Sequence, residues 1–327
     1  MDVAAGTKAG GTFVSDGPAA VQVSDSPQAV LAHHGRSFWL AARVLSPDQR
    51  QEAAILYAFC RHVDDLVDEA DDPTRASEGL ASIRAELRGE TAPRPVVAAA
   101  RRLVVRRGVP MHALLDLVDG VQGDLGAVAV ADDRELLRYC YRVAGAVGLA
   151  MCPIIGVHDP QAAAFAVDLG VGMQITNICR DVLEDAERHR CYLPQARLLA
   201  AGTSQAALLS GAASPTAVAS VVRDLLTLAD CYYDSAERGM AAIPWRARVA
   251  IRIAARVYRA IGHRILDRHG GDPMHGRTVV PTGARLWLAG QAVLQSLGEA
   301  AWRRSWTLPE HDSALHLHID DLLATVS

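Results

Sequence analysis

From Ser37 onward, apolar residues recur at three- and four-residue intervals, and no stretch alternates apolar and polar residues long enough to indicate a strand. The clearest segment, residues 47–70, places Pro47 where a first helical turn favours proline and ends in an Asp-Asp-Pro sequence that stops a helix. The other expected helices span residues 74–89, 96–107, 110–122, 133–156, 160–188, 214–240, 244–269 and 281–303. The pattern predicts a single all-α domain built as a helical bundle.

The composition agrees with this prediction and excludes several functional classes. Ala and Leu dominate and aromatic residues make up only 5 %, which favours helices over a β-sandwich. The net charge of −4 argues against a nucleic-acid-binding protein, which would carry a basic excess. Six scattered cysteines without a C-x-x-C pair argue against a disulfide scaffold or a zinc finger.

The two ends of the chain differ from its middle. Residues 1–30 are rich in Ala, Gly, Ser, Asp and Val, lack the features of a signal peptide, and are interpreted as a disordered leader before a catalytic domain at 31–304. Residues 305–327 contain His316, His318 and Asp320, a potential metal site, but we interpret them as a solvated tail. Apolar runs are too short and too interrupted to span a bilayer, so we expect a soluble chain.

Two helical segments carry acids that core packing does not explain. In the first, Asp64 and Asp68 are four residues apart and share one helix face with Arg61. In the second, a single face holds the side chains of Gln174, Asn177, Asp181 and Asp185.

We call these two sets of acidic residues the acid ladders. For either ladder taken alone, a solvent-exposed charged face is the alternative to a functional site. Like charges at i, i+4 are mildly destabilising, however, and both ladders lie in strongly apolar helices, where unpaired carboxylates are costly. Oxygen ligands without His or Cys suit Mg²⁺, with Mn²⁺ as the other candidate ion. Because Mg²⁺ binds through a few carboxylates plus substrate phosphates, the ladders predict a diphosphate substrate.

Small residues give a third clue, which has two interpretations. Glycines within helical stretches each cost about 1 kcal/mol relative to Ala, and they occur at Gly145, Gly148, Gly156, Gly170 and Gly172. They either allow close helix–helix packing or clear a path for a long, slender ligand. In the second case the path would be bounded by Val143, Val147, Ala166 and Met173.

Taken together, these segments resemble the squalene/phytoene synthase family of head-to-head prenyltransferases, and most closely its bacterial phytoene synthases. The resemblance runs from about Gly35 to Leu286. It is carried by Ser37-Phe38 with Leu56 to Asp68, by Tyr139 to Gly145, by Gln174 to Asp185 with Tyr192-Leu193-Pro194, and by Tyr258 with Arg277 to Pro281.

The resemblance implies an isoprenoid-synthase helical bundle with a central cavity and a role for each matching residue. The metal ligands would be Asp64, Asp68, Asn177, Asp181 and Asp185, with the four aspartates and Tyr57 as the catalytic group. The residues that would bind the diphosphate oxygens are Arg36, Ser37, Arg61, Arg180 and Arg277. The remaining substrate contacts would come from Phe38, Tyr139, Val143, Gln174, Tyr192 and Tyr258.

The reaction implied is the Mg²⁺-dependent condensation of two geranylgeranyl diphosphates, through prephytoene diphosphate, to phytoene, without NADPH. Alternatives are a C15-using squalene, dehydrosqualene or presqualene diphosphate synthase, a head-to-tail prenyl synthase or terpene cyclase, and a non-catalytic lipid-binding or assembly protein. The chain also departs from the family, because Asp124 is not followed by the usual Arg-Tyr pair. Since the substrates are lipids, we expect a cytoplasmic enzyme with peripheral membrane contact.

Overall fold

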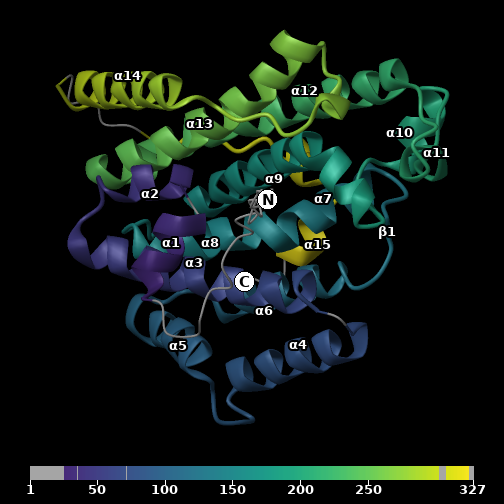
Figure 1. Ribbon diagram of the computed structural model, residues 1–327. Helices are drawn as coiled ribbons and strands as arrows, with labels where there is room; N and C mark the ends of the chain where they lie inside the picture. Colours follow the sequence, from purple (N-terminus) through teal and green to yellow (C-terminus); the bar gives the residue numbers. More distant parts are fainter. Residues whose placement is uncertain (1–25, 35, 71, 302–306, 324–327) are drawn as a thin grey trace, which may run out of the picture.

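The computed structural model describes residues 26–34, 36–70, 72–301 and 307–323 (Figure 1). The side chains at positions 34, 36–38, 269, 275, 300 and 301 lie outside this description. The elements of the first half are α1 (Pro27–His34), α2 (Arg36–Ala42), α3 (Pro47–Asp68), α4 (Pro73–Arg88), α5 (Pro95–Arg107), α6 (Met111–Gln122), β1 (Val128–Ala129), α7 (Asp133–Cys140), the π-helical turn η1 (Tyr141–Gly145) and α8 (Ala146–Ile154). Those of the second half are α9 (Gln161–Glu187), β2 (Arg190–Cys191), α10 (Gln195–Ala200), α11 (Gln205–Leu209), α12 (Pro215–Gly239), η2 (Met240–Ala242), α13 (Trp245–His269), η3 (Pro273–His275), α14 (Thr282–Ala301), η4 (Ser313–His316) and α15 (Asp320–Leu323).

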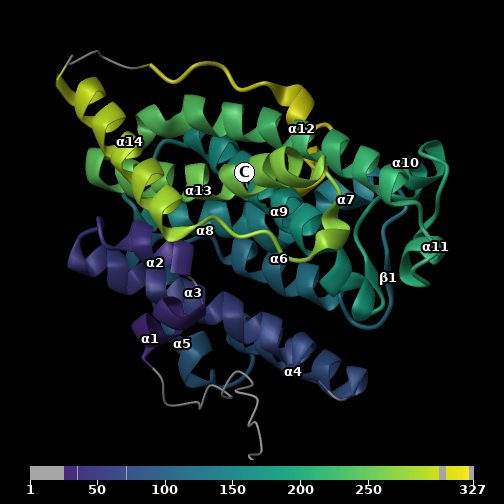
Figure 2. The same ribbon diagram turned by 45° about the horizontal axis from the view of Figure 1, so that its top comes forward.

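Helix α9 runs through the centre of the bundle. Helices α12, α13 and α14 lie on one side of it, and α3 to α6 lie on the other (Figures 1 and 2). By length and composition α9 could cross a membrane, but 61 % of its most apolar window is buried inside the fold. Such burial is typical of the core helix of a bundle.

Local sequence explains where α3 begins and which face it buries. The Ser46 hydroxyl accepts a hydrogen bond from the Gln49 amide, and the Gln49 side chain bonds back to the Ser46 amide, forming a capping box. Phe59 and Val63 are fully buried. Asp64 and Asp68 therefore project from a helix that is held from its opposite face.

The predicted all-α fold is confirmed, and each helix predicted from periodicity is present within two or three residues at either end. The expected helix at 133–156 contains the π-helical turn, and a two-residue parallel bridge pairs β1 with β2. Five α-helices of the described residues were not predicted, namely α1, α2, α10, α11 and α15. Helix α1 starts at Pro27, so the last residues of the predicted leader are helical; residues 1–25 lie outside the described part of the chain.

The prediction of a solvated tail after residue 305 is wrong for those described residues that pack onto the bundle, although many of residues 307–323 are exposed. His316 and Ile319 are buried, at 4 % and 1 % exposure. The Tyr232 hydroxyl of α12 donates a 2.7 Å hydrogen bond to the Leu315 carbonyl, and Arg138 of α7 pairs with Asp321 at 2.6 Å. The segment therefore packs onto the bundle through contacts that are far from it in sequence.

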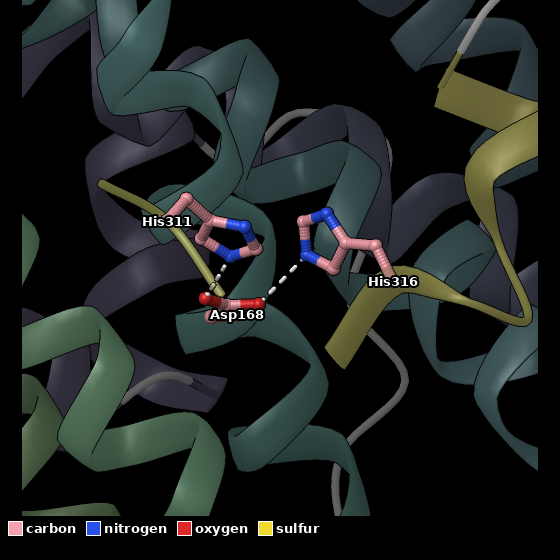
Figure 3. Close-up of side chains that lie close together, drawn as sticks. All are labelled: Asp168, His311 and His316. Atoms are coloured by element: carbon pink, nitrogen blue, oxygen red, sulfur yellow. Dashed lines mark hydrogen bonds and ion pairs between the residues drawn. The ribbon is translucent and has the colours of Figure 1, made fainter. Parts of the chain in front are cut away.

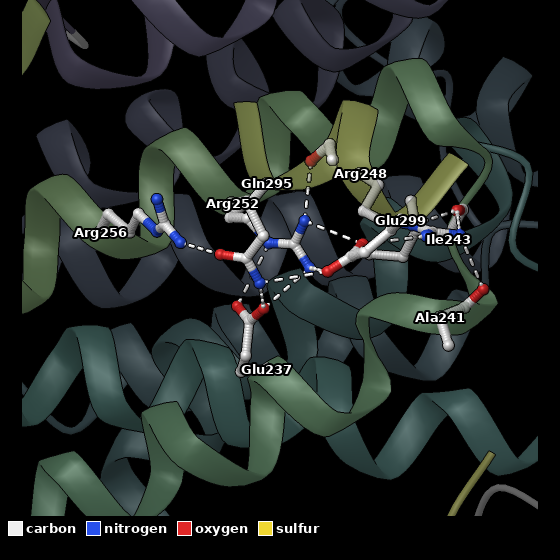
Figure 4. A network of polar contacts seen from close by, with 9 residues as sticks. Glu237, Ala241, Ile243, Arg248, Arg252, Arg256, Gln295 and Glu299 are labelled. Carbon is white, nitrogen blue, oxygen red and sulfur yellow. Dashed lines mark hydrogen bonds and ion pairs between the residues drawn. The ribbon is translucent and has the colours of Figure 1, made fainter. Parts of the chain in front are cut away.

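A charged network joins α14 to α13 and α12 (Figure 4). Its centre is Arg252 of α13, which is only 2 % exposed and donates to the Ser296 hydroxyl at 2.7 Å. Arg252 also pairs with Glu299 at 3.0 Å and with Glu237 at 2.8 Å. Arg252 is buried and Glu299 is 18 % exposed, whereas Glu237 is 40 % exposed. The pair of Arg252 and Glu299 is therefore the sheltered part of the network, and it fixes how α14 sits on the bundle.

Candidate active site

A polar cavity of about 400 Å³ lies between α3 and α9. Its charged lining consists of Asp64, Asp68, Asp124, Asp181, Glu184, Asp185, Arg61, Arg180, Arg188, Arg190 and Arg277. Both predicted acid ladders therefore face the same space, as the resemblance implied. Tyr139, Tyr192, Gln174 and Asn177 complete the polar lining.

The α3 ladder meets two arginines that follow α9. The Nη1 atom of Arg190 lies 2.9 Å from Asp68 Oδ1, and Arg188 lies 3.5 Å from the same oxygen. Between them, His189 adopts a φ of 57°, in the left-handed region, and this turn brings the chain back into β2. Arg61 lines the cavity too, but it pairs with Asp65 at 2.5 Å.

The α9 ladder has its own basic partners. Arg180 forms a two-pronged ion pair with Asp181, with Nε 2.7 Å from Oδ1. Arg277 reaches the same acid at 3.4 Å and Glu184 at 3.2 Å. Asn177 donates to Gln174 Oε1 at 3.3 Å, whereas its own carbonyl oxygen Oδ1 is buried without a hydrogen-bond partner. An orphaned amide oxygen beside carboxylates is a ready ligand for a hard cation.

Asp124 is held by two stacked tyrosines. The Tyr192 hydroxyl donates to Asp124 Oδ1 at 2.6 Å and the Tyr139 hydroxyl donates to Oδ2 at 3.1 Å. The two rings stack with centroids 4.8 Å apart. Burial nevertheless raises the pKa of Asp124 to about 6, against the opposing effect of the tyrosine hydrogen bonds.

Besides Asp124, two carboxyls of the cavity form no ion pair with Arg or Lys among the described residues, namely Asp64 and Asp185. Burial, reinforced by Asp68, raises the pKa of Asp64 to about 7. Burial and the neighbouring Asp181 likewise raise the pKa of Asp185 to about 7. Both shifts mean that burial and the neighbouring acids disfavour the carboxylate forms, which a bound cation would stabilise. The set of oxygen donors therefore fits a divalent cation of the Mg²⁺ type.

An apolar cavity of about 360 Å³ adjoins the polar one. The two share Asp64, Val143, Gln174 and Asn177 in their linings. The apolar cavity extends past Tyr57 and Tyr258 to residues of α1, α8, α9 and α13. All four predicted bounding residues line it, namely Val143, Val147, Ala166 and Met173.

The glycines of α8 and α9 are explained by close packing. A Cβ added to Gly170 would lie 2.5 Å from the Ala144 carbonyl carbon, and one at Gly148 would lie 3.0 Å from that of Ala166. The distance at Gly170 is shorter than real Cβ contacts show, and the distance at Gly148 is tighter than nine in ten of them. Because Gly148 and Gly170 also line the apolar cavity, the close approach of these helices forms its wall.

Most of the predicted site residues come together in this pair of cavities. Arg36, Ser37 and Phe38 begin α2, and their side chains lie outside the described part of the structure. Sequence reasoning missed Arg188, Arg190 and Glu184 as cavity-lining residues. Their charges were visible in the printed sequence, but the turn at His189 that aims the two arginines at Asp68 was not.

Comparison with known proteins identifies the family. The sequence matches the squalene/phytoene synthase family over residues 31–284. The chain belongs to this family. It is 36 % identical over 298 residues to a 15-cis-phytoene synthase of a Paracoccus species, covering 86 % of this chain and 96 % of the relative. It is also 37 % identical over 236 residues to a phytoene synthase of Thermus thermophilus, covering 71 % of this chain and 79 % of the relative.

Solved structures of this family share the fold. A crystal structure of a dehydrosqualene synthase superimposes with a TM-score of 0.74 at 24 % identity, covering 84 % of this chain and 95 % of that one. A squalene synthase from Alicyclobacillus acidocaldarius gives a TM-score of 0.66 at 23 % identity, covering 75 % and 92 %. The isoprenoid-synthase fold expected from the resemblance is therefore confirmed.

Proposed function

We propose that this protein is a phytoene synthase that joins two geranylgeranyl diphosphates head to head. Prephytoene diphosphate forms first, and its ionisation, rearrangement and proton loss give phytoene and release the second diphosphate. The observation that carries the proposal is the junction of a cavity lined by acids and arginines with a long apolar one. The relatives named phytoene synthase support the choice of the C20 substrate.

The acid ladders would hold Mg²⁺ in this proposal. The ligands would be Asp64, Asp68, Asn177, Asp181 and Asp185. Magnesium would neutralise the diphosphate and help it to leave the allylic carbon. The raised pKa values of Asp64 and Asp185 and the orphaned oxygen of Asn177 support this assignment.

The arginines would bind diphosphate oxygens, because a guanidinium matches two oxygens at once. Arg180 and Arg277 are well placed on the α9 side, next to Asp181. Arg188 and Arg190 lie in the same cavity as Asp124 and offer positive charge in the part of the site where the family's Arg-Tyr pair is missing. We assign substrate positioning there to these two residues.

The apolar cavity would protect the allylic cation from water. Its wall is mostly apolar away from the shared residues Asp64, Gln174 and Asn177, and water exclusion prevents premature capture of the cation. Tyr57 and Tyr258 present aromatic rings to this space, and a π-face can stabilise a desolvated cation by about 2 kcal/mol. We expect a cytoplasmic enzyme whose lipid substrates require peripheral contact with a membrane.

A C15 substrate is the second candidate, because dehydrosqualene and squalene synthases have the same fold. The deciding experiment supplies geranylgeranyl or farnesyl diphosphate to the purified protein with Mg²⁺, each with and without NADPH. A C40 hydrocarbon formed without NADPH supports the proposal. A C30 product made in preference to it would instead assign the protein to the squalene or dehydrosqualene synthases.

A matched pair of variants tests the metal assignment. Asp64→Asn removes a proposed ligand in the last turns of α3, and Asp48→Asn makes the same change in its exposed first turn. We expect D64N to lose turnover at least a hundredfold with an unchanged circular dichroism spectrum, and D48N to retain it. Comparable activity in the two variants would contradict the role of Asp64.

A further inference from the structure

A second cluster of chemically reactive side chains lies away from the catalytic cavities. The fully buried Asp168 of α9 faces two histidines of the C-terminal segment (Figure 3). Its Oδ2 atom lies 2.8 Å from Nε2 of His311, and its Oδ1 atom lies 2.8 Å from Nε2 of His316. The three ligand atoms all fall within 4.8 Å of one another. Elements more than 140 residues apart in sequence thus bring three metal-ligating groups to one point.

The buried negative charge of Asp168 would be stabilised by a bound cation. Asp168 has 0 % exposure, and among the described residues neither Lys nor Arg forms an ion pair with it. With both histidines neutral, the cluster would be a net negative charge buried in the bundle, and such charges are normally paired or bound to metal. A divalent ion would satisfy the carboxylate and both imidazoles together.

We infer that Asp168, His311 and His316 form a structural zinc site that anchors the C-terminal segment to α9. Two imidazoles and one carboxylate suit zinc, whereas Mg²⁺ takes oxygen ligands. The spacing of His311 and His316, with four residues between them, lies within the three to five common in zinc sites. At metal–ligand distances of about 2.0–2.2 Å, two ligand atoms of a tetrahedral ion lie about 3.3–3.6 Å apart. Each Asp168–histidine pair would therefore open from 2.8 Å by about 0.5–0.8 Å, and ligand atoms as far apart as 4.8 Å would move closer together.

The surroundings support a site of this kind. The Ser235 hydroxyl of α12 donates a 2.6 Å hydrogen bond to Asp168 Oδ2, and ligating carboxylates are commonly oriented in this way. His311 packs edge-on against Phe165 with ring centroids 5.2 Å apart. The side chain of His311 is 15 % exposed, so solvent reaches the edge of the cluster, and a water molecule would be the fourth ligand of a tetrahedral ion.

The site is separate from the catalytic acids. Asp168 precedes Asn177 by nine residues, or about 13 Å along the helix axis. Phe165 lines the apolar cavity and lies between it and His311. The zinc site therefore supports one wall of the cavity from outside, and its role is to order the C-terminal segment rather than to take part in the reaction.

The proposal is tested by metal analysis of the full-length chain, purified without a polyhistidine tag or chelator. We expect about one zinc per chain in the wild type and in His318→Ala, and less than a tenth of that in His311→Ala and His316→Ala. His318 lies in the same segment but outside the cluster, so it controls for general disturbance of that segment. Equal zinc in H316A and H318A would overturn the proposal.

A second measurement, a cobalt titration, uses only the wild-type protein and so does not depend on whether a variant folds. Metal-free wild-type protein is titrated with Co²⁺ in excess Mg²⁺, which saturates the oxygen ligands of the acid ladders. A four-coordinate site with nitrogen ligands gives intense visible absorption, whereas octahedral oxygen coordination gives only weak bands. Saturation at one equivalent, reversed by added Zn²⁺, is the expected result. If no intense band develops, Asp168 and the histidines form only a hydrogen-bonded clamp, and the zinc site is refuted.

Discussion

Substituting alanine for Gly170 tests whether close packing shapes the cavity wall. The added Cβ would lie 2.5 Å from the carbonyl carbon of Ala144 and 2.7 Å from the amide nitrogen of Gly145. Ordinary van der Waals contact begins at about 3.4 Å, so α9 and the π-helical turn would have to separate by about 1 Å. Both clashing groups are backbone atoms of helices, which cannot rotate away as a side chain can.

The magnitude follows from two opposing effects. Overpacking of a well-packed interior costs about 1–3 kcal/mol, and a rigid backbone obstacle places this site at the upper end. Replacing glycine by alanine in a helix raises the free energy of unfolding by about 1 kcal/mol. The net expectation for Gly170→Ala is a loss of about 2 kcal/mol. At an unfolding entropy of about 2.1 cal/mol/K per residue, this lowers Tm by about 3 °C.

The control is Gly290→Ala in the middle of α14, where an added Cβ meets nothing within 4 Å. Only the helix-propensity gain remains there, so this variant should be more stable by up to about 1 kcal/mol. Urea unfolding followed by circular dichroism measures both variants against the wild type. The same substitution should thus shift the midpoint in opposite directions. A stabilised or unchanged G170A variant would refute the packing explanation.

Three further outcomes are expected from individual contacts. Burial would raise the pKa of Glu86, but hydrogen bonds from the backbone amide and the guanidinium of Arg94 hold it below its usual value. The ionised Glu86 therefore stabilises the folded protein above pH ~4.5, and this contribution is lost as the pH falls through the pKa that Glu86 has in the folded state. Glu86→Gln should therefore cost about 1–3 kcal/mol at pH 7 in urea unfolding, and its deficit should shrink below pH 4. Arg252→Met should cost about 2 kcal/mol in the same assay, because it removes two ion pairs and the hydrogen bond to the buried Ser296 hydroxyl, although Glu299 keeps Arg248 as a partner. Arg256→Met on the same helix should stay within about 0.5 kcal/mol. Ala162→Leu places a larger side chain in the apolar cavity, about 22 Å along α9 from Asn177. It should lower kcat/KM for the C20 substrate about tenfold more than for the C15 substrate. Equal losses for the two substrates would show that Ala162 does not limit the chain length that the cavity accepts.

The main helices and the acid ladders could be predicted because they depend on local spacing. Asp64 and Asp68 share a face wherever their segment is helical, and the same holds for Asp181 and Asp185. The strongly apolar pattern around them ensured that both segments would be helical core elements. Their meeting across one cavity was implied by the family resemblance, since spacing within each helix says nothing about which helices face each other.

The rest depends on contacts that no local pattern encodes. Arg190 reaches Asp68 only because His189 turns the chain and β2 pairs with β1. The segment with His311 and His316 was interpreted as a solvated tail because their partner, Asp168, is distant in sequence and lies within an apolar helix. Short helices such as α10 and α11 carry too few turns for a periodic signal.

The charges of the catalytic cavity indicate how it would respond to its substrate. Asp68 and Asp181 already have arginine partners, whereas the carboxyls of Asp64 and Asp185 have pKa values raised to about 7. If all four carboxylates become ligands of Mg²⁺, the arginines that now bind two of them are released. The guanidinium groups nearest the site are then free to bind diphosphate oxygens at the moment when the metal arrives. Metal and diphosphate should therefore bind cooperatively, because each satisfies the charges that the other uncovers.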